Sequence, residues 1–336
     1  IEKKATAAAM ALQQSLRSAK HPQGRLQALY TLDGLGTLSA DDLLSGLEDR
    51  NYSVRLHALR LADSKLAGNA RLLKKITSMV TDPDPLVRLQ VAMSLGESSE
   101  PPAVAALVQL TRERLDERWM KAAILSSVKN IAGDLLGGLL SGKKTKPDPG
   151  LAESLAMVAG SRRRQAELTR LLEALERLDK SNGELLARCL RGLYRGLQHG
   201  AVSSFDDKRG RDALIRLLKR TGGETLSLCL QVASRLGLSG SRDLEDLYDK
   251  IAADALDEKN SEGERLKALE FLAAGPFETL ERISDRVLAP TQPPGIQLAA
   301  VGALSSMEDP RAGPLLLKSW KSYSPPIQEK VIEAIF

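Results

Sequence analysis

The sequence predicts an all-α protein, an α-solenoid or superhelix in which about ten helix pairs repeat along residues 1–336. Apolar doublets recur at intervals of 30 to 40 residues, and leucine and alanine, which favour helices, dominate the apolar composition. Aromatic residues make up only 3% of the chain, which fits badly with β-sandwiches and barrels. Because a unit of this length is too small to bury its own apolar face, successive units must stack on one another.

Each unit is expected to contain a first helix, a turn, and a second helix that carries the apolar doublet. First helices are expected at residues 41–48, 70–80 and 102–112, where apolar residues recur at i, i+3, i+4 and i+7. The ten doublets are Ala28-Leu29, Ala58-Leu59, Val91-Ala92, Ile124-Leu125, Leu155-Ala156, Cys189-Leu190, Cys229-Leu230, Ala268-Leu269, Ala300-Val301 and Val331-Ile332.

The turn inside a unit carries an Asp six residues before an Arg. The Asp is expected to cap or end one helix, and the Val-Arg dipeptide that follows opens the next. Prolines at these turns suit a turn or a first helical turn and would break a helix interior. The pairs are Asp49 with Arg55, Asp82 with Arg88 and, in a weaker form, Asp116 with Lys121.

The whole chain is interpreted as one solenoid domain with irregular insertions near residues 133–150 and 198–210. Glycines and prolines in the first segment argue against a long helix there, although its leucine pairs can form a short apolar turn that docks on the solenoid. The second segment lengthens its unit, as a tolerated insertion or as a loop that contributes to binding. The chain starts at Ile1 without a leader and ends inside an apolar periodic segment, so we expect a piece of a longer protein.

The net charge of +5 comes entirely from residues 162–220, where 15 Lys and Arg oppose 8 Asp and Glu. Such a stretch is either a solvated helix face or a surface that attracts an acidic protein, an anionic surface or nucleic acid. Aromatic residues are not interleaved with these cations, which argues against base stacking on single strands.

A leucine stripe and an arginine face occupy opposite sides of the helix expected at residues 184–197. The stripe consists of Leu186, Leu190, Leu193 and Leu197. Guanidinium groups on one face can bind carboxylates or phosphates, unless neighbours such as Glu173, Glu176 or Glu184 pair with them. The candidate binding patch is Arg162, Arg163, Arg164, Arg188, Arg191 and Arg195, roofed by the segment at 198–210.

The sequence offers no catalytic, cofactor-binding or metal-binding residues, and we expect no cofactor in this chain. Cys189 and Cys229 stand forty residues apart in doublet positions without a CxxC motif, so they are expected to be buried, reduced and unpaired. Three scattered histidines do not make a metal cluster, and the glycine clusters lack the strand-then-helix context of a nucleotide loop. No apolar run approaches the length of a membrane span.

The repeat pattern resembles HEAT and armadillo-like repeats, in which an Asp and an Arg at this turn can link neighbouring units. Residues 24–63, with an R-x-x-A-L-x-x-L-x-G-L run followed by V-R-x-x-A-L-R-L-A, look like the HEAT region of large bacterial membrane-bound dehydrogenase-type proteins. Those proteins place a β-propeller before the repeats and a c-type cytochrome with CxxCH after them. The resemblance implies an exported or periplasmic spacer in a redox-linked protein. It also implies that a dehydrogenase activity would belong to the full-length protein and not to this chain.

Three functions follow from these observations. The first is a non-catalytic spacer or protein-interaction module in a multidomain protein, whose partners are flanking domains or an acidic protein. The second is a nucleic-acid-binding helical repeat that uses the basic residues 162–220. The third is an enzyme with a ligand in a groove, which a pocket with convergent polar groups would favour. The sequence itself names no partner and no compartment.

Overall fold

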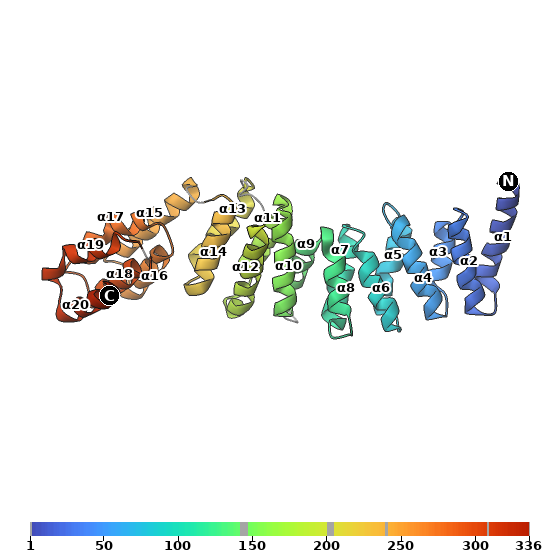
Figure 1. Cartoon of the computed structure of the whole chain (residues 1–336), viewed down its shortest axis with the longest axis horizontal. Coiled ribbons are helices and arrows are strands. Elements are labelled where there is room, and N and C mark those ends of the chain that lie inside the picture. Colours follow the sequence, from blue (N-terminus) through green and yellow to red (C-terminus); the bar gives the residue numbers. More distant parts are fainter. Residues whose placement is uncertain (1, 142–146, 200–204, 239–240, 308, 336) are drawn as a thin grey trace. The chain divides into compact units, whose positions relative to one another are not determined.

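The computed structural model describes residues 2–141, 147–199, 205–238, 241–307 and 309–335, and within these ranges it contains helices and no β-strand. Contacts divide the chain into two compact units, residues 1–159 (unit 1) and residues 160–336 (unit 2). Helices follow one another in order along each unit (Figure 1). The all-α fold predicted from the repeats is confirmed.

Unit 1 is a two-layer stack in which odd-numbered first helices contact odd-numbered ones and even-numbered second helices contact even-numbered ones. The expected first helices at 41–48, 70–80 and 102–112 correspond to α3, α5 with η2, and α7. The helices are α1 (Glu2–Ser18), α2 (Pro22–Gly34), α3 (Ala40–Leu47), α4 (Tyr52–Ala62), η1 (Asp63–Lys65), α5 (Ala70–Ser78), η2 (Met79–Thr81), α6 (Pro85–Leu95), α7 (Pro101–Arg114), α8 (Met120–Ser127), η3 (Val128–Asn130), α9 (Ala132–Leu140) and α10 (Pro149–Arg162), which runs into unit 2.

Unit 2 repeats the same alternation of first and second helices. Its helices are α11 (Gln165–Glu176), η4 (Lys180–Asn182), α12 (Gly183–Gln198), α13 (Lys208–Arg220), α14 (Gly223–Arg235), α15 (Arg242–Leu256), α16 (Glu262–Ala273), α17 (Phe277–Val287), α18 (Pro294–Ser306), α19 (Ala312–Lys318), η5 (Trp320–Ser322) and α20 (Pro325–Ile335).

The ten doublets lie in the ten second helices, α2 to α20, as predicted. The first residue of every doublet is buried, and most second residues are buried with it, so the doublets form the centre of the stack. Leu125 and Leu230 are half-buried, and Ile332 is the exception, with 49% of its surface exposed. Positions in a second helix are counted below from the first residue of its doublet.

The aspartates of the motif are expected to cap or end a helix; Asp82 ends η2 as its C-cap residue, whereas other residues cap the starts of α4 and α6. Asn51 caps α4 and Asp84 caps α6, each accepting hydrogen bonds from main-chain N–H groups of the first turn. Asp49 and Asp82 instead lie two residues earlier and accept from the N–H groups of those caps. This position leaves their carboxylates available to side chains of the neighbouring unit.

The segment at 133–150 is less irregular than the glycines suggested, because residues 132–140 form α9 and lie against α7. Leu135, Leu136 and Leu139 are buried there. A Cβ on Gly138 would stand 2.6 Å from Val108 Cγ2, so this glycine allows close helix contact instead of ending the helix. Residues 142–146 lie outside the described residues.

The segment at 198–210 is anchored at its end by Phe205, which is buried and whose N–H donates to the main-chain oxygen of Leu236. A Cβ on Gly210 would lie 2.4 Å from the Phe205 ring, so glycine makes room for it. Of the segment 198–210 that is expected to roof the arginine patch, residues 200–204 lie outside the described residues.

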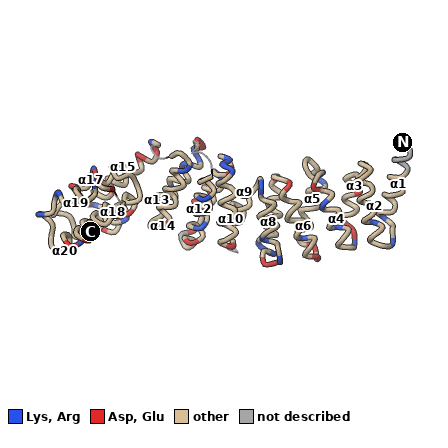
Figure 2. The backbone as a smooth tube through the Cα atoms, viewed as in Figure 1, with Lys and Arg blue, Asp and Glu red and all other residues tan. Residues whose placement is uncertain are grey.

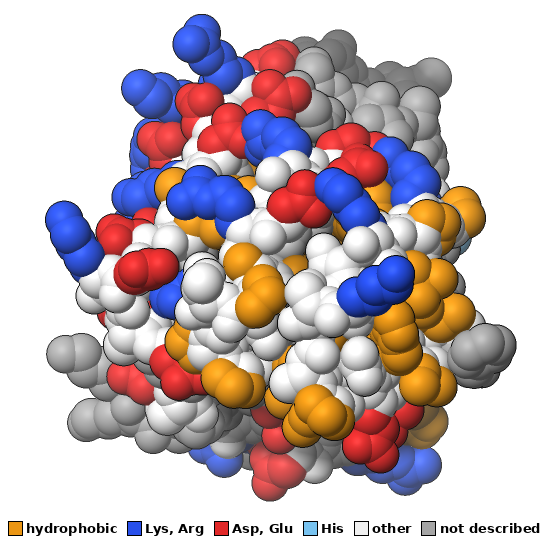
Figure 3. Space-filling view, turned by 90° about the vertical axis from the view of Figure 1, so that its left-hand side faces the viewer, with side chains coloured by type: hydrophobic (Ala, Val, Ile, Leu, Met, Phe, Trp, Pro, Cys, Tyr) orange, Lys and Arg blue, Asp and Glu red, His pale blue; other side chains and the backbone are white. Residues whose placement is uncertain are grey.

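Figure 3 faces the end of unit 2 at which α19 and α20 lie, where hydrophobic side chains appear among charged ones. Leu317, Ile332 and Ile335 are the exposed large apolar residues of these two helices. Among the described helices, no single one is long and apolar enough to cross a membrane, while the bent pair Met120–Asn130 and Ala132–Leu140, at 119°, passes that test of length and composition together.

Candidate functional site

The three consecutive arginines of the predicted patch lie where α10 ends and α11 begins. Arg162 is the last residue of α10, and its guanidinium lies 3.3 Å from the buried carboxylate of Glu167. Arg163 has a left-handed backbone, with φ of 52°, and donates to the main-chain oxygen of Leu197. Arg164 is the exposed N-cap residue of α11 and also has an interaction partner. The chain's own groups therefore engage these cations.

The leucine stripe of α12 is buried as predicted, and its arginines lie on the more exposed side. Arg188 Nε is 3.6 Å from Glu184, and Arg191 pairs with Glu224 of α14. Arg195 is exposed and has an interaction partner as well. Of the carboxylates expected to compete for these arginines, Glu184 does so, whereas Glu173 and Glu176 pair with Arg209 and Arg216.

Arg195 lies near the end of α12 that Arg163 contacts, whereas Arg188 and Arg191 lie farther along this helix. Arg163 contacts Leu197 at the end of α12, whereas Arg191 and Arg188 precede that residue by six and nine positions. At a rise of about 1.5 Å per residue, they lie roughly 9 and 14 Å from this end of the helix. Together with the ion pairs, this spacing weakens the positive field that the sequence suggested.

Both cysteines are buried, as predicted, and no disulfide joins them in the described part of the chain. Burial raises the pKa of Cys229 to about 12, although the Thr221 hydroxyl and the Arg220 charge act in the opposite direction. A thiol with so high a pKa is a poor nucleophile.

A ladder of ion pairs at position −3 of the second helices is the best-defined polar feature of unit 1. Arg25 binds Asp49 through two hydrogen bonds of 2.5 and 2.8 Å, and Arg55 binds Asp82 through two of 2.8 Å. Each acid belongs to the turn of the following helix pair. The ladder continues from Arg88 to Glu117 at 2.6 Å and from Lys121 to Asp148 at 2.8 Å.

Each ladder arginine also binds back to the turn of its own helix pair. Arg55 Nη1 donates to the main-chain oxygen of Asp49 at 2.9 Å, and Arg88 Nη1 donates to that of Asp82 at 2.5 Å. The guanidinium thus joins two turns, as the resemblance to HEAT-like repeats implied. The weaker motif needs correction, because Glu117 and not Asp116 accepts from Arg88. Glu117 is the residue whose longer side chain reaches the guanidinium.

The ladder lowers the pKa of an acid that burial would otherwise raise. Burial is the largest single influence on the pKa of Asp49 and raises it. Hydrogen bonds from Arg25 and from the N–H of Asn51, with the charges of Arg25 and Arg50, together outweigh burial, so the pKa of Asp49 is lowered.

The residue type at position −3 of the second helices changes along the chain. In α10, α12 and α14 it holds Ala152, Leu186 and Leu226, which cannot form a rung. Arg265 restores it in α16, where Nε donates to the oxygen of Ala255 at 2.9 Å and Nη2 to the Gln292 side chain at 2.5 Å. Glutamines take the position in α18 and α20 and bind main-chain oxygens of the preceding turn, Gln297 to Ala289 and Gln328 to Trp320.

Positions −5, −2 and +2 share one face of a second helix, because they follow the spacing i, i+3 and i+7. The ladder holds successive second helices of unit 1 in one register, and α2, α4, α6 and α8 contact each other in turn. Equivalent positions therefore lie on the same side of unit 1. Many of the charged residues of unit 1 lie at its turns and at the ends of its helices (Figure 2).

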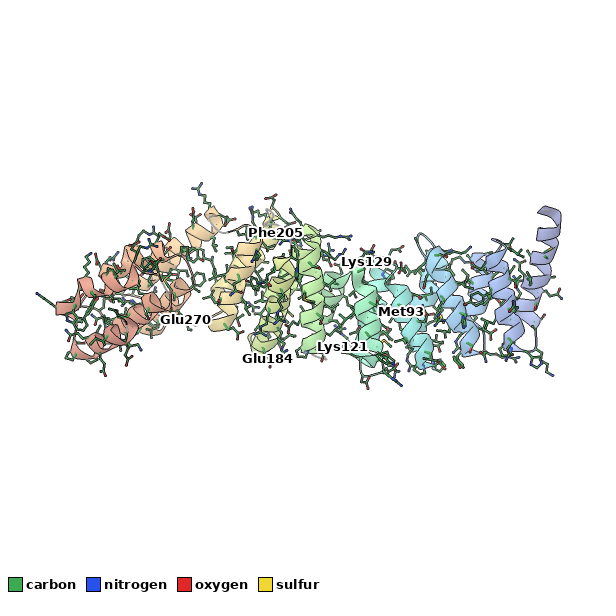
Figure 4. All side chains as sticks on the ribbon, viewed as in Figure 1. Met93, Lys121, Lys129, Glu184, Phe205 and Glu270 are labelled. Atoms are coloured by element: carbon green, nitrogen blue, oxygen red, sulfur yellow. The ribbon has the colours of Figure 1, made fainter. Side chains whose placement is uncertain are left out.

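Large apolar side chains remain exposed on this side of unit 1. Leu86 on α6 is 50% exposed, Met93 on the same helix 43%, Met157 on α10 41% and Tyr30 on α2 40%. Met93 is labelled in Figure 4. Half-buried leucines at position −2 continue the surface across α2, α4 and α6, whereas α8 and α10 hold Ala122 and Glu153 at this position. We call this the unit 1 apolar face; it consists of Leu26, Tyr30, Leu56, Leu86, Leu89, Met93 and Met157.

Charge is scarce at these positions of unit 1. Only Arg60 and Glu153 carry a charge among the residues at positions −5, −2 and +2 of α2 to α10. Arg60 is exposed and donates from Nε to Gln90 Oε1 at 3.2 Å. The Tyr30 hydroxyl and His57 Nδ1 lie 2.6 Å apart beside it. Burial, and then the charge of Arg60, lowers the pKa of His57, which favours the neutral ring.

The same positions in unit 2 carry more charge, although Leu266 and Leu298 take position −2 in α16 and α18. Arg191 and Glu224 form an ion pair across α12 and α14, and Glu270 of α16 accepts from the N–H of Gly223 at 2.6 Å. Figure 4 shows Glu184 and Glu270 on these helices. At positions −5, −2 and +2, large exposed apolar side chains therefore occur on the second helices of unit 1, whereas the exposed Ile332 and Ile335 of α20 lie at other positions. The charged residues at the equivalent positions of unit 2 are Glu184, Arg191, Glu224, Glu270, Glu329 and Glu333.

Unit 2 also contains an open cavity of about 790 Å³ between α15 and α17. Asp249 and Arg282 line it and bond to each other at 2.5 Å. Other charged residues that line this cavity are Asp257, Glu258, Lys259 and Arg286.

Comparison with known proteins places repeats where the ladder is most regular. A family model described as HEAT repeats matches residues 40–127, which cover α3 to α8. No curated protein matches this sequence.

Several solved structures are similar to the chain at low identity. A C-terminal fragment of the Chaetomium thermophilum cohesin loader SCC2 has 12% identity and a TM-score of 0.40, over 98% of this chain and 31% of that one. Kap121p bound to Ste12p has 13% identity and a TM-score of 0.35, over 99% and 45%. Human deoxyhypusine hydroxylase in complex with glycerol has 17% identity and a TM-score of 0.31, over 99% and 96%.

The chain spans about a third of the length of the cohesin loader fragment that it matches. The stacked helix pairs of both units and the family match over residues 40–127 agree. The protein is an α-solenoid of HEAT-like helix pairs, ten of them within the described residues.

Proposed function

We propose that this protein is a non-catalytic scaffold that binds a protein partner on the unit 1 apolar face. The observation that carries the proposal is the exposure of Leu86 at position −5 and of Tyr30, Met93 and Met157 at position +2 of the second helices. Contiguous exposed apolar surface with little charge is typical of protein interaction sites.

The exposed apolar residues supply part of the free energy that specific binding needs. Burying the exposed half of a leucine or methionine side chain contributes roughly 1 kcal/mol, so four such residues supply a meaningful share of a micromolar affinity of about −8 kcal/mol. The half-buried Leu26, Leu56 and Leu89 complete a rigid base beneath them. A surface held by the arginine ladder also loses little freedom on binding, which favours affinity.

The test places a photoreactive benzophenone amino acid at position 93, with the equivalent exposed position Gln231 of unit 2 as the matched control. We expect irradiation in the source cells to link position 93, and not position 231, to one protein that mass spectrometry identifies. Leu86→Asp should abolish that adduct without changing the circular dichroism spectrum. Equal adducts at both positions, or an adduct insensitive to Leu86→Asp, would contradict the proposal.

The resemblance of residues 24–63 supports a more specific role. In this proposal the scaffold is a spacer of an exported, periplasmic protein, between a propeller domain and a c-type cytochrome domain. The full-length reading frame tests it directly: a CxxCH motif downstream of residue 336 is expected, and a frame without propeller or CxxCH contradicts the redox role.

A further inference from the structure

The width of the unit 1 apolar face restricts what can lie on it. Its residues occupy positions −5, −2 and +2, and Leu86, Leu89 and Met93 fill all three on α6. Seven residues of helix extend about 10 Å, which matches the diameter of an α-helix with its side chains, about 10–12 Å. A single extended strand, with strands spaced about 4.8 Å apart, would cover only half of this width.

The spacing along the stack suits a helix as well. Packed helices stand about 8–10 Å apart, so the row at position +2 presents one side chain per step from Tyr30 through Arg60 to Met93. In a bound helix, residues seven apart are about 10.5 Å apart on one face. A heptad of apolar residues therefore places one side chain beside each second helix.

The charge of Arg60 fixes which residue of the bound segment lies opposite α4. Arg60 is the exposed cation of that row, between Tyr30 on α2 and Met93 on α6. Its hydrogen bond to Gln90 uses Nε, and no described carboxylate forms an ion pair with it. An acidic side chain opposite Arg60 would form a charge-assisted hydrogen bond in a partly desolvated setting.

From this width, spacing and charge we infer that the unit 1 apolar face binds an amphipathic α-helix of a partner protein, laid across α2, α4 and α6, with an Asp or Glu opposite Arg60. The inference rests on the proposed scaffold function and adds the chemical class of its ligand. The equivalent face of unit 2, with Glu270 and the Arg191–Glu224 pair, does not bind such a helix.

Two phage-displayed libraries of 18-residue peptides test this on the whole 336-residue chain. In one library apolar residues recur with the helical pattern i, i+3, i+4 and i+7; in the other, of equal composition, they alternate as in a strand. We expect at least tenfold greater enrichment from the helical library, with Asp or Glu selected at one position. Greater enrichment from the strand library, or none from either, would overturn the inference.

Variants locate the contact. Met93→Glu should remove the enrichment, whereas Gln231→Glu, at the equivalent position of unit 2, should leave it unchanged. Arg60→Glu should change the selected acid to Lys or Arg, because the opposing charge is reversed. Selection of acids that persists on Arg60→Glu would overturn the assigned register.

The two tests separate failure of the inference from failure of the scaffold function. Strand-library peptides that are lost on Met93→Glu would overturn the helical ligand and leave docking on this face intact. Absence of a position-93 adduct in cells, despite helical peptides that bind, would contradict the scaffold function alone.

Discussion

Arg55 shows how one side chain can hold two repeats together. Its guanidinium binds the carboxylate of Asp82 in the next pair and the main-chain oxygen of Asp49 in its own turn. Both charged side chains are largely buried, with 12% and 6% exposed. Truncating one partner of such a pair leaves the other charge buried without compensation, which costs more than the pair itself contributes.

Arg55→Ala should lower the free energy of unfolding by about 3 kcal/mol, measured by urea denaturation. The matched control is Arg71→Ala, which breaks the solvent-exposed pair with Asp41 and should cost less than about 0.5 kcal/mol. Similar losses in both variants would show that burial of the ladder contributes nothing.

The ladder should also make stability sensitive to acid. The pKa of Asp49 is lower in the folded chain than the ordinary 3.8, so the folded state binds fewer protons than the unfolded state. Its stabilising contribution is complete above the unfolded pKa and is lost as pH falls through the folded pKa. The difference in unfolding free energy between wild type and Asp49→Asn should therefore shrink as pH falls from 5 to 2; a constant difference would contradict this.

Two predictions concern α12. The prediction of its buried leucine stripe is confirmed, whereas its arginines as a binding patch stay a prediction. Its leucine stripe could be predicted because helical periodicity alone decides which side of a helix is apolar. The arginine partners could not, since Glu224 approaches Arg191 only after α14 packs beside α12.

The combined substitution of Arg188, Arg191 and Arg195 by Gln should leave duplex DNA binding unchanged within twofold in a salt titration. The pairs with Glu184 and Glu224 already offset two of the three charges. Unfolding free energy should change by less than about 0.5 kcal/mol for each exposed site. A several-fold loss of affinity, with a salt slope reduced by about 3, would instead make the arginines a nucleic-acid site.

Element α9 is a helix that the sequence did not predict, because its glycines argued against one. Local propensity disfavours glycine within helices, so the sequence suggested an irregular insertion. Close contact between Gly138 and Val108 of α7 reverses that preference, because a side chain would not fit there. Tertiary packing therefore decided this element.

At the scale of the whole molecule, most contacts join neighbouring repeats, and they divide the chain into two compact units. Repeat proteins of this kind fold through local interfaces, so a part that contains complete helix pairs retains its structure. The fragment 1–162, which keeps α10 whole, should show cooperative thermal unfolding by circular dichroism and should select the same peptides as the full chain. A fragment without a thermal transition would contradict the independence of unit 1.

The sequence by itself determined the fold class, the ten second helices and their buried doublets, because stacking of short amphipathic units requires apolar residues at regular intervals. The resemblance of its Asp–Arg motif to HEAT-like repeats also implied the links between units. Only the tertiary structure decided which acid pairs with each cation, and that Leu86, Met93 and Tyr30 remain exposed together. The physical reason is that the sequence pattern of an apolar residue is the same whether a neighbouring helix covers that residue or leaves it exposed. Covering depends on how the repeats stack, and this stacking leaves one face of unit 1 apolar and open.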